Sequence, residues 1–101
     1  MAKKRGLHEY SVQEAGNASL GQAGAKFIKD TAEHTGSFVA ITMLEDTIFA
    51  TLTPSDTTNG YGVGSYNGNT MGTETISEGL TIYGRWTTID LTSGLVIAYI
   101  G

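Results

Sequence analysis

The sequence has 101 residues and lacks cysteine altogether, which excludes disulfide bonds and thiol chemistry. Only 16% of its residues are charged, whereas an average globular protein has about 25%. No apolar run approaches the roughly 20 residues of a membrane-spanning helix, and no hydrophobic segment of a signal peptide follows the first five residues. We therefore expect no membrane partner and synthesis in a cytoplasm.

Side chains that carry chemistry are also scarce and scattered. The two histidines, His8 and His34, have no partner at the spacing of a metal site, and no serine lies in a GxSxG context. The glycine-rich stretch 60–68 has neither the GxGxxG pattern nor the following lysine of a phosphate-binding loop. We predict a protein that is not an enzyme and that needs no metal or cofactor.

Basic residues are few and concentrated at one end of the chain. The net charge is −4, but Lys3, Lys4 and Arg5 are half of the six basic residues. From residue 6 onward, three basic residues face ten acidic ones, which gives −7. This acidic part of the chain should not bind nucleic acid, because affinity for nucleic acid depends on how many phosphates the basic side chains neutralise. The basic tip is predicted either to contact an acidic partner surface or simply to aid solubility.

Threonine and glycine replace the missing charges, with fifteen and fourteen copies. β-branched residues suit strands, and glycine suits turns. The sequence therefore predicts a single all-β domain over residues 25–101, either a compact β-sandwich or a small β-barrel. Residues 1–24 form an N-terminal arm, extended or partly helical, that is rich in glycine and alanine. Such a segment buries too little apolar surface to order alone, so we expect it to be flexible or to become ordered on docking, with Leu20 as a contact residue.

Alternation of apolar and polar residues places the strands. We expect them at 26–30, 37–44, 47–54, 80–91 and 95–100, with a turn at 32–37. Glu45-Asp46 predicts a hairpin between the second and third strands, and 92–94 predicts a hairpin between the last two. The apolar face switches between Trp86 and Ile89, so a bulge is expected near Gly84 or Thr87-Thr88.

One long glycine-rich loop is expected at 55–72, after the chain's single proline, Pro54. Asn59-Gly60 and Asn67-Gly68 are turn dipeptides, and the stretch between them is a candidate short hairpin strand. Long loops are often functional. Tyr61 and Tyr66 are therefore predicted either to contact a partner or to fold back and cap the core.

The last third of the chain carries a recognisable pattern. Its residues are Gly79, Thr81 to Gly84, Trp86, Thr87, Ile89, Leu91, Ser93, Gly94 and Val96 to Tyr99. This pattern resembles the endings of small virion proteins of tailed bacteriophages, and the resemblance covers residues 25–101. It implies a decoration or cement protein on the capsid surface of the virion. Such proteins bind the major capsid protein, bridge capsomers and are commonly homotrimers.

Two alternatives remain open. The first is a head-fibre, tail or connector component of the same particle, with the 55–72 loop as its contact surface. The second belongs to another class, a small cupin-like β-barrel enzyme or ligand-binding domain. That reading would require a pocket with convergent polar groups.

Overall fold

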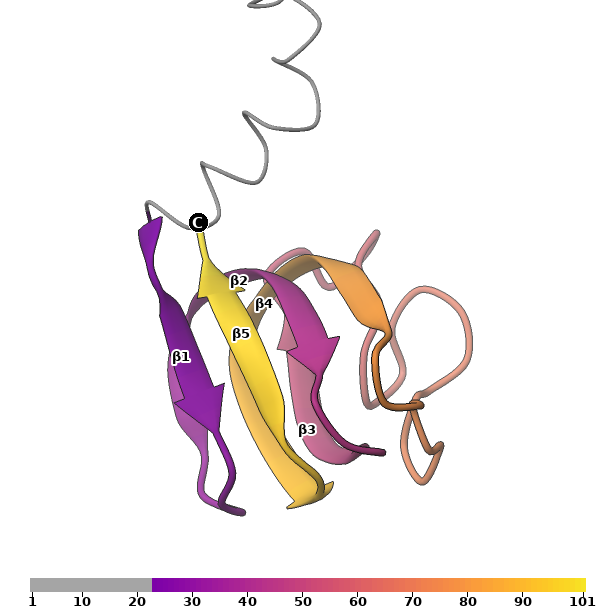
Figure 1. Cartoon of the computed structure of the whole chain (residues 1–101). Helices are drawn as coiled ribbons and strands as arrows, with labels where there is room; N and C mark the ends of the chain where they lie inside the picture. The colour runs from indigo at the N-terminus through magenta and orange to yellow at the C-terminus, as the bar shows by residue number, and fades with distance from the viewer. Residues whose placement is uncertain (1–22) are drawn as a thin grey trace, which may run out of the picture.

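The computed structural model describes residues 23–101, which form five antiparallel strands (Figure 1). The strands are β1 (Ala25–Ile28), β2 (His34–Met43), β3 (Ile48–Pro54), β4 (Thr81–Ser93) and β5 (Val96–Ile100). They form a single sheet in the order β1-β5-β2-β4-β3. The predicted all-β class is confirmed. The arm predicted over residues 1–24 lies almost wholly outside the described residues.

The sheet bends strongly enough to enclose its own core. The two longest strands, β2 and β4, curve over the top of the molecule in the view of Figure 1; β4 passes behind β5, and β3 lies behind the end of β2. β4 pairs with β2 from Thr81 to Ile89 and, on its other side, with β3 from Trp86 to Ser93. The bend lets one sheet supply both layers of a barrel-like fold.

Every strand contributes to the core. Its buried side chains are Ile28, Phe38, Ile41, Met43, Phe49, Leu52, Trp86, Ile89, Leu91, Val96 and Ala98. Each large apolar side chain in such a position stabilises the fold by about 1.5–3 kcal/mol relative to exposure. The alternation that predicted the strands arises from this burial, since successive side chains of a strand point to opposite faces.

Both of the predicted bulge positions in β4 are irregular. On the β2 side, Phe38 pairs with Trp86, and Ala40, two residues later, pairs with Tyr83, three residues before Trp86. On the β3 side, Thr53 pairs with Thr88, and the next residue, Pro54, pairs with Trp86, two residues before Thr88. The extra residues let side chains three apart, at 86 and 89, both face the core.

The two predicted hairpins are wrong. β3 pairs with β4 and not with β2, and β5 pairs with β1 and β2 and not with β4. The turns themselves exist, but each carries the chain from one part of the bent sheet to another. Gly94, between β4 and β5, has a φ of 114°, which a residue with a side chain rarely adopts. The turn predicted at 32–37 ends earlier, because β2 already begins at His34.

Candidate interaction surface

The segment between β3 and β4 is a loop held by its own backbone. The stretch predicted as a hairpin strand makes only an isolated bridge, Leu52 to Val63, so that prediction is wrong. Backbone N–H groups of Asn67 and Met71 donate to the carbonyl oxygens of Gly60 and Gly62, at 3.0 and 2.9 Å. These bonds close the loop on itself, so its shape is set before any partner binds.

Tyr61 fastens this loop to the core. Its ring meets that of Trp86 edge-on, with centroids 5.4 Å apart, and the Trp86 Nε1 donates to the Tyr61 carbonyl oxygen at 2.8 Å. The Tyr61 hydroxyl donates to the Tyr83 carbonyl oxygen. Burial raises the pKa of the Tyr61 phenol, and this hydrogen bond opposes the rise. Of the two roles predicted for Tyr61, the structure shows the capping of the core.

Tyr66 packs within the loop itself. Its ring lies over Gly64, where an added Cβ would come within 3.0 Å of the ring. The Thr70 hydroxyl accepts a hydrogen bond from the Gly64 N–H at 2.8 Å. The exposed residues around Tyr66 are Ser65, Asn67, Gly68, Asn69 and Thr70. The loop therefore presents a small, uncharged tip, and Tyr66 supports it from one side.

A strained residue closes the loop. Thr73 has a φ of 68°, in the left-handed region that β-branched residues avoid. The Glu74 N–H donates to the Met71 carbonyl oxygen at 3.2 Å across this turn. Residues in such conformations cost about 1–3 kcal/mol, and they tend to occur where a loop's shape serves a function.

An aspartate organises the start of the same loop. Oδ1 of Asp56 accepts the backbone N–H groups of Thr58 and Asn59 at 3.0 and 3.1 Å. The Asn59 side chain donates to the other carboxylate oxygen. These bonds, led by the backbone N–H of Asn59, lower the pKa of the Asp56 carboxyl. The carboxylate thus serves as a turn-forming group.

A second exposed surface lies on the outside of the sheet, which we call the outer face. It is made of two adjacent rows of residues that pair across β1, β5, β2 and β4. The rows are Ala25–Tyr99–Ala40–Tyr83 and Phe27–Ile97–Thr42–Thr81. Ala40, within the first row, is fully buried. A hydrogen bond of 2.8 Å between the hydroxyls of Thr42 and Thr81 shows that these side chains share a face. The eight positions include no charged residue.

Large apolar side chains are exposed on and beside the outer face. Phe27 is 56% exposed and Tyr83 is 65% exposed, whereas Ile28, the residue after Phe27, is buried. Leu44 and Leu80, also exposed, lie at the end of β2 and the start of β4. This surface was not predicted from the sequence, because its strands come together only through non-local pairing.

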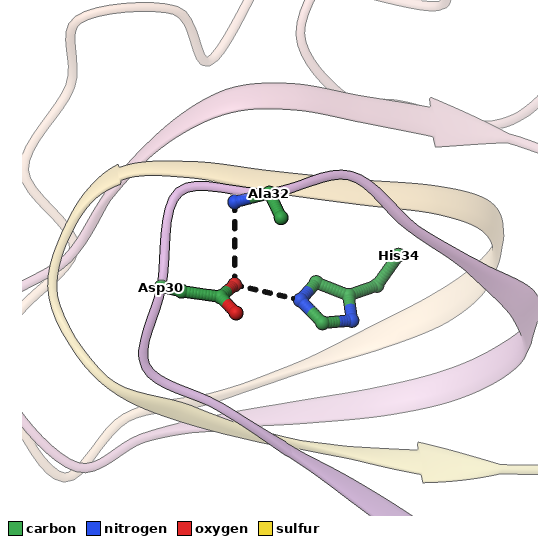
Figure 2. A network of polar contacts seen from close by, with 3 residues as sticks. All are labelled: Asp30, Ala32 and His34. Atoms are coloured by element: carbon green, nitrogen blue, oxygen red, sulfur yellow. Dashed lines mark hydrogen bonds and ion pairs between the residues drawn. The ribbon is translucent and has the colours of Figure 1, made fainter.

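The one histidine within residues 23–101 belongs to a turn (Figure 2). His34 Nε2 donates to Oδ1 of Asp30 at 2.8 Å, and the Ala32 N–H donates to the same oxygen at 3.2 Å. The His34 hydrogen bond, followed by that of Ala32, lowers the pKa of the exposed Asp30 carboxyl. Over residues 23–101, no group of three metal-ligating side chains comes together, and no helix is long and apolar enough to cross a membrane.

Four of the predicted partner-binding residues, Lys3, Lys4, Arg5 and Leu20, lie outside the described residues. The structure brings the other two, Tyr61 and Tyr66, into one loop, where both are half-buried. No family model, no curated protein and no solved structure matches the chain. The surfaces themselves are therefore the basis for any functional assignment.

Proposed function

We propose that this protein is a capsid decoration protein of a tailed bacteriophage, which binds the outside of the capsid and stabilises it by bridging capsomers. The proposal combines the resemblance of residues 25–101 to small virion proteins with one structural observation. That observation is the preformed loop 55–72, which projects from the sheet and presents an uncharged tip (Figure 1).

Several features of the loop support a contact role. Its backbone is fixed by hydrogen bonds among its own residues, and Tyr61 attaches it to the core through Trp86. A loop that is already ordered loses little conformational entropy when it binds a flat surface. The strained φ of Thr73 fits a loop whose shape is retained for a partner.

A decoration protein acts through buried area. When it binds adjacent capsomers in the assembled shell but not the separated subunits, mass action makes the shell more stable. Chemistry of bond making and breaking is not required for this role. The predicted arm, with Lys3 to Arg5 at its tip, would add a second contact, and two linked contacts raise avidity without higher affinity at either one.

The proposal is tested on purified virus particles from the source of the sequence. We expect peptides of this chain in the particle proteome and antibody labelling distributed over the head. Recombinant full-length chain, added to particles stripped of it, should rebind and raise the temperature at which they release DNA. Absence of the chain from purified particles would overturn the proposal.

Matched loop variants test which surface is involved. Asn69→Lys at the tip should weaken rebinding about tenfold or more, whereas Thr35→Lys, an exposed threonine on β2, should not. Labelling confined to the tail or neck would instead assign the chain to a fibre or connector.

A further inference from the structure

The outer face is a neutral area on an acidic body. Residues 23–101 contain eight acidic and three basic residues, and none of the eleven lies in the two rows of the face. Two copies of such a body repel each other wherever carboxylates meet. The outer face is where two copies can approach without that repulsion, and it exposes Phe27 and Tyr83.

The two ends of the outer face differ in charge. Beyond Tyr83 lies Arg85, whose Nη1 donates to the Gly101 carbonyl oxygen at 3.1 Å and to the Ser37 hydroxyl at 3.2 Å. These contacts hold the guanidinium at the edge of the face where β5 ends. The charged side chain that these contacts place at this end is therefore basic.

The opposite end carries carboxylates. Leu44 donates its N–H to the Leu95 carbonyl oxygen at 2.8 Å, which extends the face by one more row, and Glu45 and Asp46 follow directly. The Glu78 N–H donates to Oδ1 of Asp46 at 2.9 Å, which brings a third carboxylate to the same corner. Lys29 and Asp30 follow β1 at this end and offset each other in charge.

We propose that the outer face binds the outer face of a second copy of this chain, related by a two-fold axis that runs across the strands. This operation places the Arg85 end of each copy against the Glu45, Asp46 and Glu78 corner of the other. Contacts of a two-fold interface are reciprocal, so each pair of opposite charges occurs twice. The same two-fold operation places the small Ala25 of one copy against the large Phe27 of the other.

The size of the face sets the strength of the contact. Four strands about 4.8 Å apart and three rows about 6.6 Å apart span roughly 400 Å² on each copy. Stable complexes bury about 800 Å² on each partner, and weaker, transient ones bury less. The pair should therefore form at micromolar to millimolar concentrations and dissociate on dilution.

This inference rests on the outer face alone and is independent of the proposed capsid role. The resemblance implies three copies, whereas the outer face by itself predicts two. Sedimentation equilibrium of the full-length chain over a wide concentration range distinguishes them. We expect a monomer–dimer equilibrium, and a chain that stays monomeric at millimolar concentration, or that forms only trimers, would overturn the inference.

A pair of variants tests the surface. Tyr83→Glu should weaken the dimer at least tenfold, because it places two carboxylates in the contact. Thr35→Glu, an exposed threonine of β2 outside the outer face, adds the same charge and should leave the dimer unchanged. Equal effects of the two variants would show that the surface is elsewhere. Circular dichroism confirms that each variant is folded.

Charge reversal tests the orientation. Glu45→Lys should weaken the dimer severalfold, as should Arg85→Glu, and the double variant should recover most of the lost affinity. The single-variant effects should grow at low salt, since screening weakens interactions between exposed charges. Additive losses in the double variant would exclude the proposed arrangement.

Discussion

Trp86 holds Tyr61 by two different contacts, a hydrogen bond from Nε1 to the Tyr61 carbonyl oxygen and an edge-on contact between the rings. The residues are 25 positions apart, on β4 and in the long loop. Because Trp86 is buried in the core, this pair makes the loop an extension of the hydrophobic core. The loop's shape should therefore depend on the core's integrity.

Trp86→Phe should destabilise the protein by about 2–4 kcal/mol, since it shortens a core side chain and leaves the Tyr61 carbonyl without its donor. Tyr61→Phe removes only the hydroxyl bond to the Tyr83 carbonyl and should cost about 0.5–1.5 kcal/mol. Denaturant unfolding measures both. Tyr83→Phe, at an exposed side chain, is the control and should stay within about 0.5 kcal/mol of the parent.

Gly94→Ala should destabilise the fold by roughly 2–4 kcal/mol through its left-handed backbone and a close contact. An added Cβ would lie 2.3 Å from the Thr47 hydroxyl oxygen and 2.7 Å from the Thr47 Cα. Gly79→Ala is the matched control, because Gly79 has a φ of 90° but no atom within 4 Å of an added Cβ. It should cost only about 1 kcal/mol. Equal losses in thermal unfolding would show that backbone conformation alone matters at Gly94.

Thr73→Gly should stabilise the protein by about 0.5–1 kcal/mol. Removing the steric cost of the left-handed conformation should stabilise the fold by about 1–2 kcal/mol. The greater conformational freedom of glycine in the unfolded chain offsets part of this gain. Urea unfolding tests the sign. A clear loss of stability would mean that the threonine side chain makes a contact that outweighs the strain.

Acid should weaken the fold through two surface turns. The pKa of both Asp30 and Asp56 is lowered in the folded protein, by the His34 bond and the Asn59 N–H respectively. Their stabilising contribution is therefore present above the unfolded pKa of about 3.9 and is lost as pH falls through the lower folded value. Asp56→Asn should reduce stability at neutral pH and make it less dependent on pH below about 4. A parallel pH profile for parent and variant would contradict this account.

Alkali should act through Tyr61. Burial raises its pKa, so its contribution to stability is complete below the unfolded pKa of about 10 and is lost as pH rises through the folded value. A titration followed by tyrosinate absorbance should contain a late step, at which the Tyr61 phenol ionises. Tyr61→Phe should remove that late step, and its persistence would assign the step to another tyrosine.

Local rules predicted much of the architecture. The alternation of apolar residues located all five strands within a few positions, and Pro54 ends β3 as expected because it cannot donate to a strand pair. The odd spacing of Trp86 and Ile89 predicted the bulges in β4. These features depend only on neighbouring residues, and so the sequence contains them directly.

The candidate surfaces were predicted less well. The 55–72 loop was recognised by its glycines and turn dipeptides, but its tyrosines were assigned with two roles left open. The burial of Tyr61 depends on Trp86, whose position across the core cannot be read from residues near the loop. Phe27 and Tyr83 share an outer face only because β5 and β2 lie between their strands.

Sequence by itself thus determined which segments are strands, where they end and where they bulge, since each follows from backbone sterics and side-chain alternation over a few residues. Tertiary structure decided which strands pair. Both expected hairpins failed because the bend of β2 and β4 places β5 beside β1 and moves β3 to the far side of β4. Which strands pair depends on the packing of the whole core around Phe38, Phe49 and Trp86. The pairing therefore cannot be predicted from any one segment of the chain.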